Sequence, residues 1–222
     1  MRILAKRALR DFWKRHPKAK GPLEAWHQEV ARADWATPST VKLQFRSASI
    51  LPDNRVVFNI AGNQYRLVAK INYPYRVVYI RFIGTHAAYD SVDATTIERY
   101  GGLMTIAPIK TARDYGRALR RIEQLMDAKQ GTKAGDELDV LTTLVEAYEA
   151  KHHAICPPAP IEAIKFRMDQ LGMTRKDLAA MLGGRGRVSE ILTGKRSLSL
   201  EMIRRLHRKL HIPLESLIGT AA

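Results

Sequence analysis

Residues 56–84 read VVFNIAGNQYRLVAKINYPYRVVYIRFIG, and this stretch decides the fold. Runs rich in Val, Ile, Phe and Tyr occupy residues 56–60, 65–73 and 77–84, and these residue types favour strands. The Gly62-Asn63 pair and the segment at residues 74–76, PYR, supply turns between them. The pattern therefore predicts an antiparallel meander of at least three strands.

Helical segments flank this meander on both sides. Residues 3–16 place Leu4, Ala8, Leu9 and Phe12 at helical spacing, and residues 23–36 follow as a second helix after the breaks at residues 17–22. We expect this helical hairpin to pack on one face of an antiparallel sheet. Beyond the short break at residues 99–103, RYGGL, the pattern is helical throughout. The chain is thus expected to be α+β, with an all-α second half.

Composition limits the functional classes. The 222 residues are 45% hydrophobic and include one cysteine, Cys156, so we expect a buried core, no disulfide framework and a reducing, cytoplasmic location. Residues 1–12, MRILAKRALRDF, lack the apolar run of a signal peptide, and no stretch is long enough to span a membrane. The pair His152-His153 has no Cys or carboxylate at ligand spacing, so no metal or other cofactor is expected.

The net charge of +15 is concentrated in two blocks. Residues 1–98 hold 16 Lys and Arg against 8 Asp and Glu, residues 104–161 hold 8 against 8, and residues 162–222 hold 12 against 6. Basic blocks attract phosphate backbones, although a merely soluble basic surface would give the same count.

The first candidate site lies on the predicted sheet. Alternation along the strands puts four polar side chains on one face, and His86, Tyr89 and Asp90 follow at the end of the last strand. The four are Arg66, Lys70, Tyr79 and Arg81. The other face, with Val78, Ile80 and Phe82, would rest on the helical hairpin.

This set suits cleavage of RNA without a metal. Arginines and a lysine stabilise a charged phosphate, a histidine moves protons near neutral pH, and tyrosines stack on bases. The alternative is an ordinary solvated sheet face followed by a helix start at Tyr89-Asp90.

Residues 62–97, GNQYRLVAKINYPYRVVYIRFIGTHAAYDSVDATTI, resemble HigB-type toxins of the RelE-like group of mRNA interferases, and the similarity extends over roughly residues 1–98. The resemblance implies a small toxin that cuts mRNA on the translating ribosome. It assigns His86 as proton donor, Lys70 as candidate base, Arg66 and Arg81 to the phosphate, and Tyr89 to the same site. Asp90 either orients His86 or caps a helix, and both interpretations stay open.

The second candidate site is residues 174–194, TRKDLAAMLGGRGRVSEILTG. Thr174 and Asp177 form the pattern of a capping box, and buried Leu, Val and Ile positions would lock two helices while a basic face stays outside. The segment resembles Cro/C1-type helix-turn-helix domains, and residues 104–222 resemble HigA-type antitoxins. The resemblance implies that bases are contacted by Arg187, Ser189, Glu190 and Thr193. It implies that phosphates are contacted by Arg185, Lys195 and Arg196.

Together these features predict a fused toxin–antitoxin pair. Its parts are a toxin domain at residues 1–98, a junction at 99–103, a helical antitoxin region at 104–155 and a helix-turn-helix domain at 156–222. The expected function is a latent, ribosome-dependent mRNA endoribonuclease held inactive by an antitoxin that binds operator DNA as an autorepressor. The alternative is a DNA-binding regulator with an inert toxin-like domain. Expected partners are mRNA on the ribosome, operator DNA and a second copy in a homodimer, with toxin–antitoxin contact inside one chain or between two.

Overall fold

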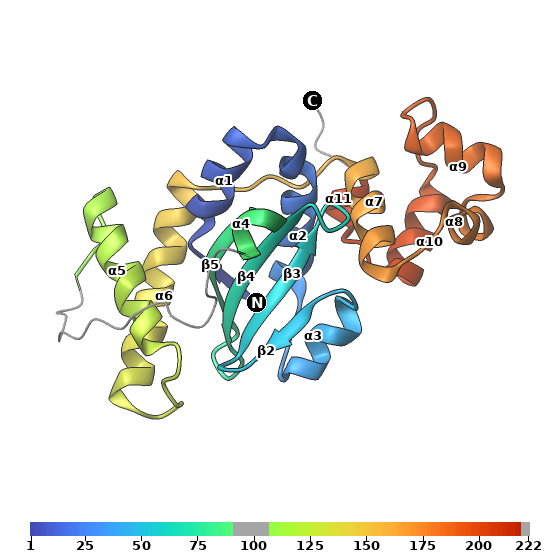
Figure 1. The fold of residues 1–222 in the computed structure, drawn as a ribbon. Coiled ribbons are helices and arrows are strands. Elements are labelled where there is room, and N and C mark those ends of the chain that lie inside the picture. Colours follow the sequence, from blue (N-terminus) through green and yellow to red (C-terminus); the bar gives the residue numbers. More distant parts are fainter. Residues whose placement is uncertain (91–106, 219–222) are drawn as a thin grey trace.

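The chain folds around a five-stranded sheet in the computed structural model, which describes residues 1–90 and 107–218 (Figure 1). The strands lie in the order β1-β5-β4-β3-β2. Their bounds are β1 Arg2–Leu4, β2 Ser49–Leu51, β3 Arg55–Ile60, β4 Tyr65–Asn72 and β5 Val77–Thr85. β3, β4 and β5 pair antiparallel, as the turn signals predicted. β2, which was not predicted, pairs antiparallel with β3, and β1 adds a parallel edge beside β5.

One face of this sheet is covered by the N-terminal helices. α1 (Lys6–Arg15) and α2 (Lys20–Arg32) lie behind it in Figure 1, linked by the short 3₁₀ turn η1 (Pro17–Ala19). The ring of Trp26 on α2 meets Phe58 on β3 edge-on, with ring centroids 5.4 Å apart, and both side chains are fully buried. Aromatic burial of this kind contributes strongly to a core. The face of the sheet toward α1 and α2 is therefore a core face, and its residues are not available to bind a ligand. α3 (Pro38–Gln44) precedes β2, and α4 (His86–Asp90) follows β5.

The first expected helix begins later than the periodicity indicated. Residues 2–4 pair with β5 as a strand, and Ala5 then turns the chain at φ 66° before α1 starts at Lys6. Ile3 and Leu4 of this strand are buried, and the two residues are 2% and 0% exposed. The expectation of a helix from residue 3 was therefore wrong, because sheet pairing buries the same apolar residues equally well.

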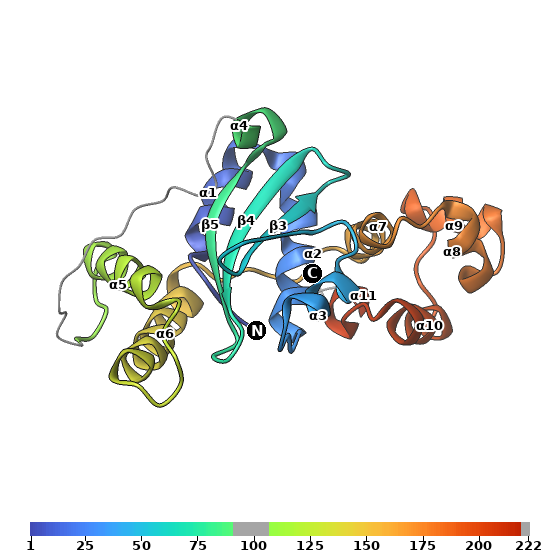
Figure 2. The same cartoon turned by 60° about the horizontal axis from the view of Figure 1, so that its bottom comes forward.

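Two groups of helices flank the sheet (Figure 1 and Figure 2). α5 (Ala112–Leu125) and α6 (Lys133–His152) pack on each other beside β1 and β5. α7 (Pro160–Leu171), α8 (Arg175–Leu182), α9 (Arg185–Leu192), α10 (Leu200–Leu210) and α11 (Leu214–Ile218) lie on the opposite side. The expected junction at residues 99–103 falls outside the described residues. Among the described helices, none is both long and apolar enough to cross a membrane.

The last five helices have a hydrophobic core of their own. It includes Ile164 of α7, Leu178 and Leu182 of α8, Ile191 of α9 and Leu206 of α10. The expected capping box is confirmed, since Asp177 Oδ2 accepts from the Thr174 backbone N–H at 2.8 Å and Thr174 accepts from Asp177 N–H. This arrangement is a helix-turn-helix unit with α9 as its second helix.

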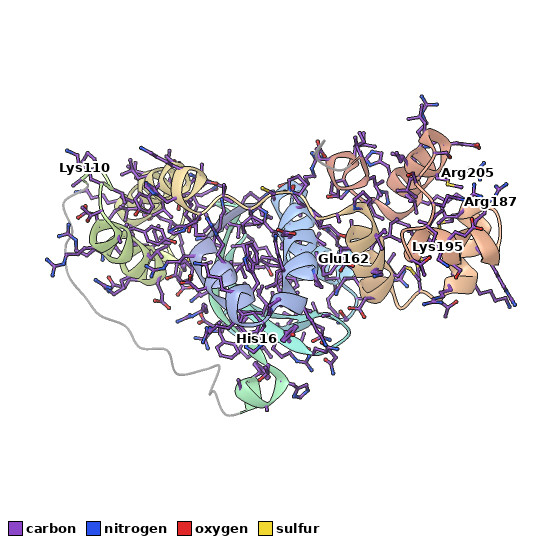
Figure 3. All side chains as sticks on the ribbon, turned by 90° about the horizontal axis from the view of Figure 1, so that it is seen from above. His16, Lys110, Glu162, Arg187, Lys195 and Arg205 are labelled. Carbon is purple, nitrogen blue, oxygen red and sulfur yellow. The ribbon has the colours of Figure 1, made fainter. Side chains whose placement is uncertain are left out.

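α7 belongs to this unit and also docks on the α+β unit. Its Phe166 packs edge-on against Phe45, with centroids 6.2 Å apart, and Gln170 Nε2 donates to the Asn59 carbonyl at 2.9 Å. The approach to α2 is close: a Cβ added at Gly21 would lie 2.9 Å from Cγ of Glu162, which is labelled in Figure 3. One helix therefore joins the two cores.

Arg167 and Glu29 form a buried ion pair at the centre of this contact. The Arg167 Nη1 to Glu29 Oε2 distance is 3.1 Å, and the two side chains are 5% and 4% exposed. Arg167 also donates to the carbonyls of Leu210 and Gln44, at 2.8 Å each. Burial raises the pKa of Glu29 to about 7, against the opposing effect of the Arg167 charge. Removing one partner of such a pair leaves a buried charge that costs about 3–5 kcal/mol.

The raised pKa of Glu29 predicts a specific pH dependence. Because the folded pKa exceeds the usual carboxyl value, Glu29 favours folding at low pH, and this contribution is lost as pH rises through the range 4.5 to 7. The free energy of unfolding of the wild type, minus that of Glu29→Gln, should fall by about 1–3 kcal/mol between pH 5 and pH 8. Denaturant unfolding of both proteins across this range measures the difference. A difference that does not change with pH would contradict the assignment.

Candidate functional site

The structure brings the sequence-predicted residues to one face and one end of the sheet. We call the face opposite α1 and α2 the open face. On it Lys70 stands beside Tyr79, its partner on β5, and Arg66 stands beside Gly84. His86 begins α4 at the end of β5 and is exposed. The roles assigned to these residues remain predictions.

A bulge in β5 changes the open face from what strict alternation predicts. Ala69 pairs with Ile80 and Val68 with Phe82, so Arg81 is an extra residue between the two pairs. A bulge of this kind shifts the alternation of the side chains that follow it. Phe82 consequently lies on the open face opposite Val68, and the expectation that it joins the apolar face was wrong.

Lys70 is a buried cation held by two carboxylates. Its side chain is 5% exposed, and Nζ lies 3.0 Å from Asp53 Oδ2 and 2.8 Å from Asp127 Oδ2. Asp53 precedes β3 and belongs to the same α+β unit, whereas Asp127 follows α5. Although partial burial raises the pKa of Asp53, its hydrogen bonds to Lys70 and Arg55 outweigh this and lower it. A buried charge requires such partners.

Arg81 makes the equivalent contact with α5 itself. Its Nη2 lies 2.7 Å from Glu123 Oε1, and its side chain is 6% exposed. Asn72, two residues beyond Lys70 on β4, donates to the Met126 carbonyl at 3.0 Å. The C-terminal half of α5 and the residues after it therefore cover Lys70, Arg81 and Asn72 together. We call residues 123–128 the cover.

An apolar and polar network anchors the cover to the rest of the sheet. Tyr79 packs in one cluster with Tyr115 and Ile122 of α5 and Leu141 of α6, and burial raises the pKa of Tyr79. The carboxylate of Glu149, fully buried, accepts from Tyr115 Oη at 2.6 Å and from the Lys6 backbone N–H at 2.9 Å. Burial also raises the pKa of Glu149.

The other half of the open face stays accessible. Arg66, Phe82 and Tyr89 are half-buried and His86 is exposed. The rings of Phe82 and Tyr89 are 6.5 Å apart at 48°. α4 begins at His86, so the alternative of a helix start at Tyr89-Asp90 was wrong. Asp90 is the last residue given for α4 and its side chain is not described, so whether it orients His86 stays open.

Two residues of this site were missed by sequence reasoning. Arg55 pairs with Lys70 across β3 and β4 and is 8% exposed, and its Nη2 lies 3.1 Å from Asp53. Asp53 and Asn54 have φ of 61° and 53°, a left-handed turn that Asp and Asn tolerate. The Pro-Asp-Asn turn was the signal available for Asp53. Within the described residues, no group of three or more His, Cys, Asp or Glu side chains is placed to hold a metal ion.

The second candidate site is the outer surface of the helix-turn-helix unit. Arg187 and Lys195 are exposed, and both lie on the part of the protein far from Lys110, with Arg187 at its outer edge (Figure 3). Arg185, Ser189, Thr193 and Arg196 are exposed too. Glu190 is half-buried, and its Oε2 accepts from Arg196 Nε at 2.6 Å. Thr193 is the C-cap of α9, and its hydroxyl donates to the Ser189 carbonyl. These bonds compete with base contacts by Glu190 and Thr193.

Two family models match the chain at these two sites. A RelE-like toxic component of a toxin-antitoxin system matches residues 19–92, which include all the residues predicted for the first site. A helix-turn-helix model matches residues 164–217, which include the second.

Curated relatives match the N-terminal part of the chain. The mRNA interferase toxin HigB of Escherichia coli (strain K12) is 32% identical over 92 residues, which are 40% of this chain and 88% of that protein. The mRNA interferase HigB of Shigella flexneri gives the same values. The mRNA interferase HigB of Escherichia coli O6:H1 (strain CFT073) is 22% identical over 94 residues, covering 41% of this chain and 91% of that protein.

The bulged strand makes Gly84 intolerant of a side chain. A Cβ there would lie 2.4 Å from Cζ of Phe82 and 3.3 Å from the Ala88 Cβ. Gly84→Ala should lower the free energy of unfolding by about 1–3 kcal/mol, because the ring must move. Gly116→Ala, on α5 with only the flexible Arg120 side chain nearby, serves as the control and should be neutral or stabilising. Equal effects of the two substitutions, measured by denaturant unfolding, would contradict this packing.

Proposed function

The chain belongs, through its N-terminal part, to the HigB family of RelE-like toxins, and on that premise we propose that it is a ribosome-dependent mRNA endoribonuclease fused to its own antitoxin. The helix-turn-helix unit that follows is the DNA-binding part of that antitoxin. The observation that carries the proposal is the pairing of Lys70 and Arg81 with carboxylates of the cover.

The open face supplies the groups that metal-independent RNA cleavage needs. Lys70, Arg81 and Arg66 stabilise the charge on the phosphate, and His86 gives a proton to the leaving 5′-oxygen. In its deprotonated form Lys70 is the candidate base for the 2′-hydroxyl, and once it has taken that proton it carries the charge that stabilises the phosphate. Tyr89 is assigned to the same site. Asp53 and Arg55 join this set as neighbours of Lys70.

The cover explains why the intact chain would be inactive. Glu123 and Asp127 form ion pairs with Arg81 and Lys70, the cations that a scissile phosphate would otherwise contact. α5 also packs in one apolar cluster with Tyr79. An RNA phosphate therefore competes with two carboxylates already in place. We assign the latency to direct occlusion of the site.

The helix-turn-helix unit is proposed to bind operator DNA as an autorepressor. Arg187 and Ser189 face the major groove, with Arg185, Lys195 and Arg196 at phosphates. Repressors of this class bind palindromic sites as dimers, so we expect a homodimer on DNA. The competing function, a DNA-binding regulator with an inert toxin domain, differs in predicting no RNA cleavage under any condition.

Reversing the two negative charges of the cover tests the proposed enzyme. Glu123→Lys with Asp127→Lys, made in the full chain, should repel Lys70 and Arg81 and uncover the site. We expect new 5′ ends in mRNA on translating ribosomes, absent with the wild type. Adding His86→Ala should lower this cleavage about 10²- to 10⁴-fold, since it removes the proton donor.

Acetylation of Lys70, followed by mass spectrometry, shows independently whether the cover has opened. Asp11→Lys with Glu201→Lys makes the same charge change on α1 and α10 and should leave both Lys70 labelling and cleavage as in the wild type. Full labelling of Lys70 without any new 5′ ends would exclude the enzyme and leave the DNA-binding regulator.

Two substitutions on the helix-turn-helix unit test the DNA proposal. Lys195→Ala should weaken binding to all sequences similarly and reduce the salt slope by about 1, because a phosphate contact is lost. Arg187→Ala should cost about 1–3 kcal/mol on the operator alone. Lys110→Ala, at the far end of the protein, is the control. Fluorescence anisotropy with DNA from upstream of the chain's own gene measures each affinity, and an unchanged affinity for both variants would refute the assigned surface.

A further inference from the structure

Phe82 is an aromatic side chain on the open face that no sequence pattern placed there. Val57, Val68 and Phe82 are successive cross-strand partners on β3, β4 and β5. Val57 and Val68 are 3% and 4% exposed and stand outside the core cluster formed with α1 and α2. Phe82 is only half-buried. The open face thus has a small apolar floor whose accessible member is a phenyl ring.

The ring of Phe82 lies over the backbone of Gly84, which has no side chain in the way. It occupies the space that a Cβ at Gly84 would need, with its Cζ and Cε1 at 2.4 and 2.9 Å from that position. Ala88 of α4 bounds the same space, and the Tyr89 ring stands 6.5 Å away at a tilt of 48°. The result is an aromatic platform over Gly84 with a second ring at its edge.

The platform lies between the cations proposed to meet phosphates. Val68, the partner of Phe82, has Arg66 and Lys70 two residues away on either side along β4, which is about 7 Å in a strand. Arg81 precedes Phe82 directly in the bulge. A base resting on the ring would have its own phosphates within reach of these side chains.

The cover leaves this platform open. Its polar contacts reach Lys70, Arg81 and Asn72, while Phe82 and Tyr89 remain half-buried and His86 exposed. The intact chain therefore presents an aromatic surface beside blocked cations. Stacking of bases on aromatic rings is the usual way in which single-stranded RNA is held, and it tolerates any base.

We propose that Phe82 stacks on a base of single-stranded RNA next to the cleaved phosphate, with Tyr89 at the edge of that base, and that this contact forms even in the covered chain. The inference rests on the proposed ribonuclease function for its biological meaning. Its physical content, a base on a ring, does not require cleavage.

The full chain can be tested directly with a short single-stranded RNA that carries 2-aminopurine, whose fluorescence is quenched by stacking. Arg187→Ala with Lys195→Ala is present in every protein, to weaken binding by the helix-turn-helix unit. Quenching should occur with Phe82 intact and with Phe82→Trp, which keeps an aromatic face. Phe82→Leu should abolish quenching and weaken binding about 5- to 100-fold. Leu43→Ser, on an exposed apolar residue of α3, is the control and should behave as the parent.

Each result decides the matter. Loss of quenching in Phe82→Leu with rescue by Phe82→Trp, at unchanged thermal stability, supports the platform. Equal quenching by the leucine variant, or no quenching by the parent, overturns it. Failure of the uncovered Glu123→Lys and Asp127→Lys protein to cut mRNA is a separate result: with Phe82-dependent quenching, it would leave an RNA-binding surface without an enzyme.

Discussion

A single buried cation organises the relation between the two halves of this chain. Lys70, 4% exposed as a residue, stands on a central strand where water cannot solvate its charge. One of its carboxylates, Asp53, comes from the α+β unit, and the other, Asp127, comes from the segment after α5. The same electrostatic requirement that a phosphate would satisfy is thus satisfied by a side chain of the second half. Arg81, in the bulge of β5, likewise forms an ion pair with a carboxylate of the second half, that of Glu123.

The second half of the chain contacts the α+β unit at two separate places. α5 and α6 pack against the β1 and β5 edge, and α7 packs against α2 on the other side (Figure 1). The first contact includes the ion pairs of Lys70 with Asp127 and of Arg81 with Glu123. The second includes one buried ion pair, Arg167 with Glu29, and the packing of Phe166 against Phe45. Because α7 also contributes Ile164 to the helix-turn-helix core, the orientation of the DNA-binding surface is tied to the α+β unit.

The fold was largely predictable from the sequence, and the site only in part. Turn residues and β-branched runs identified three strands, and the capping box located α8, because both signals are local. The β1 strand was missed because Ile3 and Leu4 fit a helical stripe as well as a strand. The bulge at Arg81 has no sequence signature, so Phe82 was put on the wrong face. The partners of Lys70 and Arg81 are distant in sequence, and only the tertiary structure brings them together.

The cover belongs to the same polypeptide as the cations it contacts. In a pair of separate proteins, the fraction of uncovered sites depends on how much of each partner is made and on dilution. Here every site is produced together with one cover, at a local concentration that dilution does not change. Under the proposed occlusion, opening of the site would therefore be an internal equilibrium of each molecule, insensitive to gene dosage and to the unequal turnover of two proteins.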